Sequence, residues 1–348
     1  MPLITFTDKG LYCPAGDIYI DPWKPVKRAV ITHAHSDHAR WGNDHYLAHH
    51  HSIPLLQSRL GEGNYQGIEW DESLMINDVK ISLHPAGHMI GSSQVKLEYK
   101  GEVWVVSGDY KLENDGISGA FEPVRCHSFI TESTFGLPIY TWKKQEEIFQ
   151  SIQSWILHNK EQGKASVLLA YSLGKAQRLL PCLQGVTSEI YAHGAIFNAQ
   201  ETLKNAGWQL PPVHRVIPEL SKDTLKGAVV LAPPSAANTT WMKRFGSPAV
   251  GICSGWMQVR GNVRRKNADA GFVLSDHADW PALLEAVKLT GAERVFVTHG
   301  FQSVFSRYLN EQGLMAAEVK TEYGEEEDLA TITEPDEEAG KDTTNELP

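Results

Sequence analysis

The pattern of hydrophobic and polar positions over the first 135 residues predicts mainly strands and turns, with one pair of strands that alternates. Residues 95–99 show this alternation, Lys100-Gly101 supplies a turn, and the apolar run over 103–108 returns beside it. Shorter apolar runs predict further strands at 18–20, 29–33 and 79–83. The first part of the chain is therefore expected to be rich in β-sheet.

The next part of the chain shows a helical period. A helix is predicted over 143–162, because Ile148, Ile152 and Ile156 fall on one stripe and Gly163 ends it. From there to residue 266 short strands and short helices alternate, which is typical of an α/β unit. The strands expected in this unit are 165–170, 228–231 and 249–253, and its first helix is 174–183. A segment at 272–274, a helix over 281–289, a strand over 294–297 and a helix over 302–312 complete the chain.

Length and composition are those of a globular protein with a sizeable core. The chain has 348 residues, of which 42% are hydrophobic and 21% charged, enough for about two domains. No apolar run approaches the roughly 18 residues of a membrane helix, and the first ten residues lack the layout of a signal peptide. A cytoplasmic location is expected. The four cysteines are far apart and form no CxxC pair, so they are expected to be reduced and mostly buried.

Charge is sorted along the chain. The net charge of −10 would by itself argue against a polyanionic partner. Residues 170–266, however, hold 12 Lys and Arg against 4 Asp and Glu, a net charge of +8. Residues 324–348 hold 1 against 10 and little apolar material, and are expected to form a disordered acidic tail. This tail either keeps the protein soluble or mimics nucleic acid in a basic groove.

The strongest chemical signal is the sequence HAHSDH, which starts at His33 and follows the apolar residues 29–31. Neutral imidazoles and a carboxylate are ligands of zinc and similar divalent cations. In an irregular turn His33 and His35 can reach one cation while Asp37 and His38 reach a second. This loop is therefore predicted to serve two metal ions.

Two further strand ends supply candidate ligands. His88 lies in a glycine-flanked turn after the strand at 79–83, and Asp109 follows the strand that ends at Gly108. Two cations that lie about 3.5 to 4 Å apart need a carboxylate able to bridge them, and Asp109 is predicted to be that ligand.

Two other groups near this loop are predicted to take no part in chemistry. The consecutive side chains of His49, His50 and His51 are expected to splay apart on the surface, without a further ligand. Trp23 and Trp41 flank the metal loop and are expected to pack rather than to stack on bases.

The order HAHSDH, then Gly87-His88, then Ser107-Gly108-Asp109, resembles the signature of the metallo-β-lactamase fold. The resemblance implies an α/β protein built as an αββα sandwich, with a binuclear metal site at one sheet edge. The fold hosts lactamases, glyoxalase II enzymes, tRNA-processing nucleases and DNA nucleases, so it does not decide the substrate.

Glu132, His277 and His299 match, in order, the acidic motif A, the histidine motif B and the motif C of the β-CASP nuclease branch of this fold. Members of that branch carry an inserted domain before motif C, and the basic middle of the chain corresponds to it. The resemblance thus implies a metallo-β-lactamase domain over 1–140 and 267–323, an inserted α/β β-CASP domain over 141–266, and the tail 324–348.

Longer motifs are similar to those of the bacterial ligase-associated DNA exonuclease family, over residues 1 to about 323. They are YSLGKAQR at 171–178, CSGW at 253–256 and SDHADW at 275–280. This resemblance implies a DNA substrate, a role in DNA repair, and a DNA ligase and a helicase of the same pathway as partners. Histidine at motif C is typical of RNA-processing members, so His299 keeps an RNA substrate open.

The chemistry expected of these residues is phosphodiester hydrolysis, in which two cations, zinc or manganese, activate a bridging hydroxide that attacks the phosphate. His277 is placed to protonate the leaving oxygen, with Glu132 as its orienting partner; the alternative for His277 is a structural role. Asp21 would orient a ligand histidine. Asp37 is predicted to be both a catalytic residue and a metal ligand. The predicted ligand set is His33, His35, Asp37, His38, His88, Asp109 and His299.

The basic middle is predicted to bind the nucleic acid. Ser172, Gly174 and Lys175 open a helix after a strand, where they can hold a terminal phosphate as in related 5′-exonucleases; a simple helix cap is the alternative. Attack from the 5′ end is therefore expected. Ser254 and Trp256 are further candidates for nucleic-acid binding, with Trp256 as a stacking platform. Arg260, Arg264 and Arg265 would follow the phosphate backbone, or belong to a solvated linker.

Three alternatives to a DNA exonuclease stay open: an RNA-processing nuclease, a glyoxalase II-type thioester hydrolase and a scaffold without catalysis. The scaffold is disfavoured because every predicted ligand position is filled. The thioester hydrolase is disfavoured because it leaves the basic segment and the His277 motif unexplained.

Overall fold

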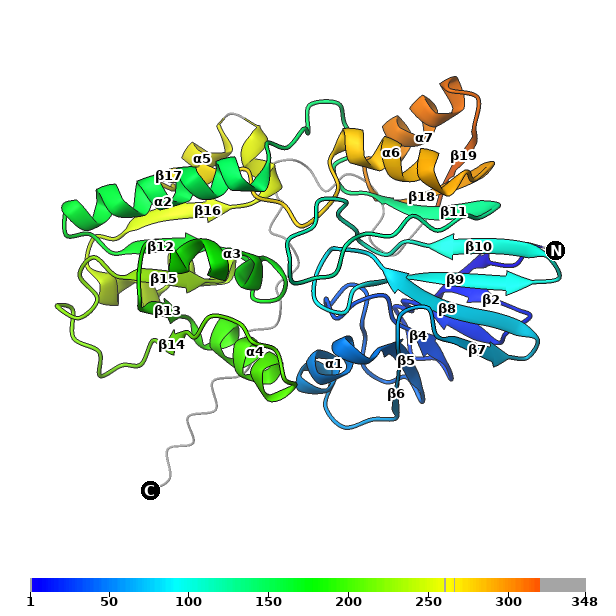
Figure 1. Ribbon diagram of the computed structural model, residues 1–348, viewed down its shortest axis with the longest axis horizontal. Helices are drawn as coiled ribbons and strands as arrows, with labels where there is room; N and C mark the ends of the chain where they lie inside the picture. Colours follow the sequence, from blue (N-terminus) through cyan, green and yellow to red (C-terminus); the bar gives the residue numbers. More distant parts are fainter. Residues whose placement is uncertain (1, 260, 266, 320–348) are drawn as a thin grey trace. The chain divides into compact units, whose positions relative to one another are not determined.

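The computed structural model describes residues 2–259, 261–265 and 267–319. These residues form two compact units, one from 2–142 with 275–319 and one from 143–274 (Figure 1). The second unit extends past residue 266, where the sequence placed its end, because β17 (Ala270–Phe272) pairs with β16 (Ala249–Cys253). The predicted acidic tail lies outside the described residues. Within them, no helix is both long enough and apolar enough to span a membrane.

The first sheet of the first unit has six strands in the order β1-β2-β3-β4-β5-β6. Its first three strands pair antiparallel, and β3 to β6 run parallel, so the carboxyl ends of these four strands lie at one edge. The strands are β1 (Thr5–Thr7), β2 (Gly10–Cys13), β3 (Ile18–Ile20), β4 (Ala29–Val30), β5 (Tyr46–His49) and β6 (Tyr65–Ile68). The 3-10 turn η1 (His50–Ser52) and helix α1 (Ile53–Leu60) connect β5 to β6.

The second sheet of this unit has seven strands in the order β19-β18-β11-β10-β9-β8-β7. Strands β7 to β10 are antiparallel, whereas β10, β11, β18 and β19 are parallel. The strands are β7 (Ser73–Ile76), β8 (Val79–Pro85), β9 (Ser93–Tyr99), β10 (Glu102–Val106), β11 (Ser128–Ser133), β18 (Arg294–Gly300) and β19 (Met315–Glu318). The helices α6 (Trp280–Thr290) and α7 (Gln302–Glu311) flank β18 in the chain.

The alternating side chains of β10 show how the layers pack. Trp104 and Val106 face a core that apolar residues of both sheets share, among them Val30 of β4. Val105, which points the other way, joins a second core together with Leu283 of α6 and Phe305 of α7. The first unit is therefore a pair of packed sheets with helices on the outer face of the second sheet, and the predicted mixed α/β architecture is confirmed.

The second unit is a six-stranded parallel sheet in the order β14-β13-β15-β12-β16-β17. In β12, Leu168 faces one apolar cluster and Val167 and Leu169 face another. Besides β16 and β17, the strands of the second unit are β12 (Ser166–Leu169), β13 (Ile190–Ala192), β14 (His214–Arg215) and β15 (Val229–Ala232). Its helices are α2 (Gln145–Glu161), α3 (Lys175–Gln184), α4 (Gly194–Asn205), α5 (Asn262–Arg265) and the 3-10 turns η2 (Pro234–Ala236), η3 (Thr240–Phe245) and η4 (Gly255–Gln258). Three longer helices, α2, α3 and α4, pack on one face, and mainly 3-10 turns pack on the other.

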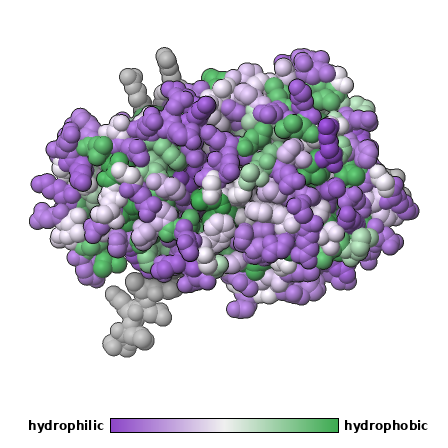
Figure 2. All heavy atoms as spheres, viewed as in Figure 1, coloured by the Kyte–Doolittle hydropathy of each residue, from purple (hydrophilic) through white to green (hydrophobic). Residues whose placement is uncertain are grey.

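The surface and the cysteines are those of a stable globular chain. The face in Figure 2 is largely hydrophilic, with hydrophobic residues in small scattered groups. All four cysteines lie in described parts of the chain, and each is buried with a free thiol, as the sequence predicted.

Candidate metal centre

The candidate centre forms where several strands of the first unit end. The HAHSDH loop follows β4, and His88 lies in the turn between β8 and β9. Asp109 follows β10, and Glu132 lies near the end of β11, its parallel neighbour. Parallel neighbours have their carboxyl ends at one sheet edge, which brings Asp109 and Glu132 together. The HAHSDH loop comes from the other sheet, which packs against this one.

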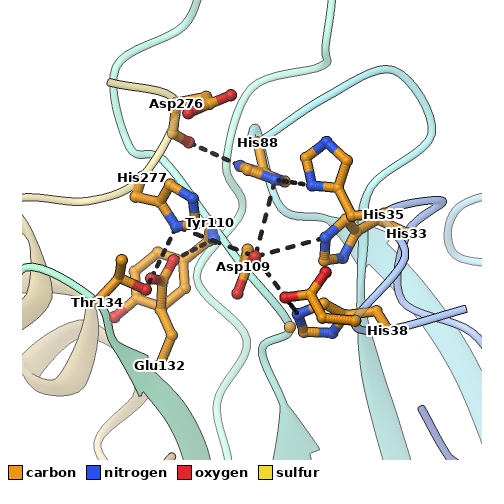
Figure 3. Close-up of polar contacts among 12 residues, drawn as sticks. His33, His35, His38, His88, Asp109, Tyr110, Glu132, Thr134, Asp276 and His277 are labelled. Atoms are coloured by element: carbon orange, nitrogen blue, oxygen red, sulfur yellow. Dashed lines mark hydrogen bonds and ion pairs between the residues drawn. The ribbon is translucent and has the colours of Figure 1, made fainter. Parts of the chain in front are cut away.

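Asp109 is the meeting point of this centre (Figure 3). Its Oδ2 atom lies 3.4 Å from Nε2 of His33 and 3.4 Å from Nε2 of His38. The same oxygen is 3.8 Å from Nε2 of His88 and 4.0 Å from Nδ1 of His277. Gly108, at φ 57°, allows this approach, since a Cβ atom there would lie 2.7 Å from the side chain of Thr32.

Two groups of possible ligands share the Asp109 carboxylate. In the first, ligand atoms of His33, His35, His88 and Asp109 all lie within 4.8 Å of one another. In the second, the same holds for Asp37, His38 and Asp109. This arrangement supports the prediction that Asp109 bridges two cations.

The chemistry of the donors fits divalent cations. The Nε2 atoms of His33 and His38 are buried and accept or donate no hydrogen bond in the described chain, which is costly unless another partner binds them. Burial lowers the pKa of His33 well below its usual range, so its ring is neutral. Burial alone would raise the pKa of Asp109, but the charges of His38 and His277 hold it well below its usual range. Burial alone would lower the pKa of His38, but the carboxylates of Asp109 and Asp37 raise it well above its usual range, so a cation that binds this ring must displace its proton. The neutral ring of His33 and the ionised Asp109 already have the forms that bind a cation.

Asp21, the carboxylate predicted to orient a ligand histidine, contacts the second ligand group. It follows β3 and has a positive φ of 44°. Its Oδ1 accepts the Thr32 N–H at 2.8 Å, and its Oδ2 lies 2.8 Å from Nδ1 of His38. Asp21 also accepts the Thr32 hydroxyl at 2.6 Å. With Nδ1 of His38 engaged, its Nε2 is left to face Asp109.

The orientation of His88 depends on a backbone group from a distant segment. Its Nδ1 donates to the carbonyl oxygen of Asp276 at 2.9 Å, across 188 positions. This bond leaves the Nε2 lone pair directed at the centre, 3.1 Å from Nδ1 of His35. Burial lowers the pKa of His88 to about 3, so the ring is neutral and its Nε2 lone pair can bind a cation.

His277 and Glu132 form a pair beside Asp109. Nδ1 of His277 lies 2.9 Å from Oε2 of Glu132, whose other oxygen accepts the Tyr110 N–H at 2.8 Å. The hydroxyl of Thr134 also donates to Glu132. Burial alone would lower the pKa of His277, but the charges of Glu132 and Asp109 raise it to about 9. His277 is therefore protonated at neutral pH, as a proton donor must be.

Trp142 holds the backbone around His277. Its indole N–H donates to the His277 carbonyl at 3.0 Å, and its backbone N–H donates to Asp279 at 2.7 Å.

His299, near the end of β18, adopts φ 50° and places its ring centre 5.4 Å from that of His38. The contributions of Trp142 and of Thr32 and Thr134 were not predicted, because hydroxyl and indole groups carry no metal-ligand pattern in sequence.

The tryptophans near the metal loop differ from each other. Trp23 donates its indole N–H to the Asp8 carbonyl at 2.8 Å, which suits a packing role. Trp41 is 75% exposed, so the prediction that it packs is wrong.

The predicted phosphate turn lies in the second unit, at the start of α3. Gly174 is the N-cap at φ 80°, and α3 has no side-chain cap, so the helix-cap alternative for Ser172 does not hold. The Ser172 hydroxyl is buried and makes no hydrogen bond within the described residues. Nζ of Lys175 lies 4.5 Å from the centre of the Tyr171 ring.

Ser254 and Trp256 lie at the end of β16, the parallel neighbour of β12, and thus at the same sheet edge as Ser172. The Ser254 hydroxyl accepts the Trp256 N–H at 3.4 Å and caps η4. Trp256 is partly buried and packs against an apolar cluster of the sheet. Arg264 and Arg265 belong to α5, and Arg260 lies outside the described residues.

Three known proteins are similar in sequence to this chain. The chain is 30% identical over 320 residues to a probable DNA ligase of Opitutus terrae, covering 91% of this chain and 31% of that protein. It is 20% identical over 245 residues to an RNase J-like protein of Methanocaldococcus jannaschii, covering 60% and 58%. It is 25% identical over 293 residues to RNase aCSPSF2 of Saccharolobus solfataricus, covering 70% and 57%. The chain is thus similar to nucleases of the β-CASP branch of the metallo-β-lactamase fold.

The chain spans about a third of the ligase relative and less than two thirds of the two RNases. A solved structure of a protein of unknown function from Enterococcus faecalis shares the fold of this chain, with a TM-score of 0.61 at 12% identity. That likeness covers 85% of this chain and 80% of the other. No family model matches the chain.

Proposed function

We propose that this protein is a metal-dependent nuclease that degrades DNA from the 5′ end during DNA repair. The observation that carries the proposal is the Asp109 carboxylate, shared by two ligand groups and placed beside the His277–Glu132 pair. A phosphodiester suits both features, because the metal ligands can hold cations against its phosphate and the His277–Glu132 pair can protonate its leaving oxygen. The ligase relative supports a DNA substrate, because one part of that longer protein resembles nearly all of this chain.

Each side chain of the centre has a task in this reaction. Divalent cations, zinc or manganese, held by the two ligand groups would polarise a phosphate and lower the pKa of water. His277 protonates the leaving oxygen, and Glu132 keeps its Nδ1 engaged so that Nε2 presents the proton. Asp21 and the Asp276 carbonyl hold the rings of His38 and His88 in their ligand orientations.

The second unit is proposed to be the inserted β-CASP domain that binds the nucleic acid. Its segment 170–266 carries the net charge of +8, which favours a polyanion. The buried and unbonded hydroxyl of Ser172, next to the first N–H groups of α3, supports a terminal-phosphate site. Such a site would explain attack from a 5′ end.

Replacing Lys175 by methionine is expected to remove the preference for 5′-phosphorylated over 5′-hydroxyl ends. Methionine keeps the volume beside Tyr171 but lacks the charge that a phosphate needs. The initial rates on the two end types measure this effect. The exposed Lys222, replaced in the same way, is the control and should leave the preference unchanged. Equal loss on both end types would make Lys175 an ordinary backbone contact.

Labelled oligonucleotides test the whole proposal. DNA and RNA of one sequence, single-stranded and duplex, labelled at the 5′ or the 3′ end, are incubated with the metal-loaded protein and their products followed over time. We expect DNA to shorten from its 5′ end faster than RNA. Faster cleavage of RNA would favour the alternative that His299 at motif C and the RNase relatives support. Hydrolysis of S-lactoylglutathione without any nuclease activity would favour the thioester hydrolase.

A further inference from the structure

A second group of metal-ligating side chains lies in the first unit, apart from the residues around Asp109. His49, His50 and His51, at the junction of β5 and η1, have ring centres 4.5 Å (49 to 50), 4.7 Å (49 to 51) and 3.9 Å (50 to 51) apart. One ligand atom from each lies within 4.8 Å of the others. The prediction that these rings splay on the surface is therefore wrong.

The local backbone explains why the three rings converge. His49 is extended, at φ −62° and ψ 139°, and the chain then curls into the 3-10 turn η1. The backbone N–H of His51 donates to Nδ1 of His49 at 3.3 Å. This change of direction replaces the alternation of a strand, in which neighbouring side chains point to opposite faces.

The adjacent strand supplies a fourth donor. β6 pairs parallel with β5, with Ile68 opposite His49, so Glu69 follows at the same edge. Oε2 of Glu69 lies 3.1 Å from Nδ1 of His50 and 4.0 Å from Nε2 of His49. The Trp70 ring stacks on His49, with centres 4.2 Å apart and an angle of 14° between the rings, and fixes that imidazole.

The protonation states suit a cation. Burial, with smaller contributions from the neighbouring histidines, lowers the pKa of His49 to about 3. Burial also lowers the pKa of His51. Nε2 of His49 is buried and makes no hydrogen bond to any described residue. Binding a cation there moves the ring hydrogen to Nδ1 and gives up only the long 3.3 Å contact from His51.

We propose that His49, His50, His51 and Glu69 form a second metal site that binds zinc or a similar divalent cation as a structural ion. Three imidazoles and one carboxylate fill a tetrahedral coordination shell, which leaves no open position for a substrate. The site is independent of the proposed nuclease activity, since its four donors are distinct from the ligands around Asp109.

Two hydrogen bonds connect this site to the turn that carries His88. The hydroxyl of Ser52, in η1, donates to the carbonyl of Gly91 at 2.9 Å. The indole N–H of Trp70 donates to the hydroxyl of Ser93 at 3.0 Å. An ion at the second site would therefore restrain η1 and Trp70, and through them both ends of the segment 91–93.

A cobalt titration of the full-length chain tests the proposal. The protein carries no polyhistidine tag and contains Asp109→Ala, which disables the centre described above. We expect it to bind a cobalt ion with the visible absorption of tetrahedral coordination, and zinc to displace this ion. His50→Asn or Glu69→Gln, added to this background, should weaken binding by at least the roughly 10- to 100-fold that loss of an outer-shell partner costs.

The two substituted side chains are partly or largely exposed, so we expect both variants to fold. The side chains of His50 and Glu69 are 39% and 68% exposed, so their replacement leaves the core intact. His45→Asn is the matched control, because His45 is exposed and its ring contacts Asn64 rather than the proposed ligands; it should leave cobalt binding unchanged. No cobalt binding in the Asp109→Ala background, or binding that neither His50→Asn nor Glu69→Gln weakens, would overturn the proposal. The titration reads no nuclease activity, so failure of the proposed function would not affect it.

Discussion

Replacing Asp109 by alanine is expected to abolish hydrolysis and to strip the surrounding centre of its metal ions. Oδ2 of Asp109 lies 3.4 Å from the ring nitrogens of both His33 and His38, so one substitution removes a ligand from each group. It also removes the negative charge that offsets the burial of cations among these histidines. The effect should therefore exceed that of losing any single histidine.

Metal content per chain, measured by mass spectrometry after dialysis, and cleavage of labelled DNA check this result together. Asp109→Asn keeps the shape of the side chain and should also be inactive, because a neutral amide is a poor bridging ligand. Asp8→Ala, at an exposed aspartate, is the control for removal of a carboxylate and should behave as the wild type. Two ions per chain together with full activity in Asp109→Ala would refute the bridging role.

Replacing His277 by alanine is expected to reduce the rate on DNA by about 10²- to 10⁴-fold, the usual effect of losing a general acid. Metal content and DNA binding should persist, because the nearest partner of its ring is Glu132, at 2.9 Å, rather than a ligand. The substitution should thus lower kcat with little change in KM.

The leaving group distinguishes a proton donor from a structural histidine. The p-nitrophenyl ester of thymidine 5′-phosphate releases a phenolate that needs no proton, so His277→Ala should cleave it at close to the wild-type rate. Glu132→Gln, which keeps its shape but loses the charge that holds the imidazolium, should show the same pattern with a smaller loss on DNA. An equal loss on both substrates would contradict the donor role and favour a structural one.

The parts of the site that sequence predicts are those that short motifs encode. The HAHSDH loop, His88 and Asp109 each combine metal-ligating side chains with the end of an apolar strand, so residue type and position point to the same interpretation. The hairpin over 95–108 and the helix α2 are likewise strongly periodic.

The parts that sequence does not predict depend on tertiary contacts. Any residue offers the backbone carbonyl with which Asp276 orients His88, so no residue type signals it. Glu69 reaches His50 only through the register of β5 and β6. Strands as short as β4, with two residues, lie below the length at which alternation can be detected.

The hydrogen bonds of Trp142 also affect which part of the chain can change without moving His277. Trp142 is the last residue before the second unit, and its partners His277 and Asp279 follow shortly after that unit ends. The chain segments on either side of the second unit are thus hydrogen-bonded to each other within the first unit, through Trp142, His277 and Asp279. The part of the chain between these segments could therefore change in length or charge without displacing His277. Changes within the second unit could therefore alter what that unit binds while the proposed proton donor keeps its position.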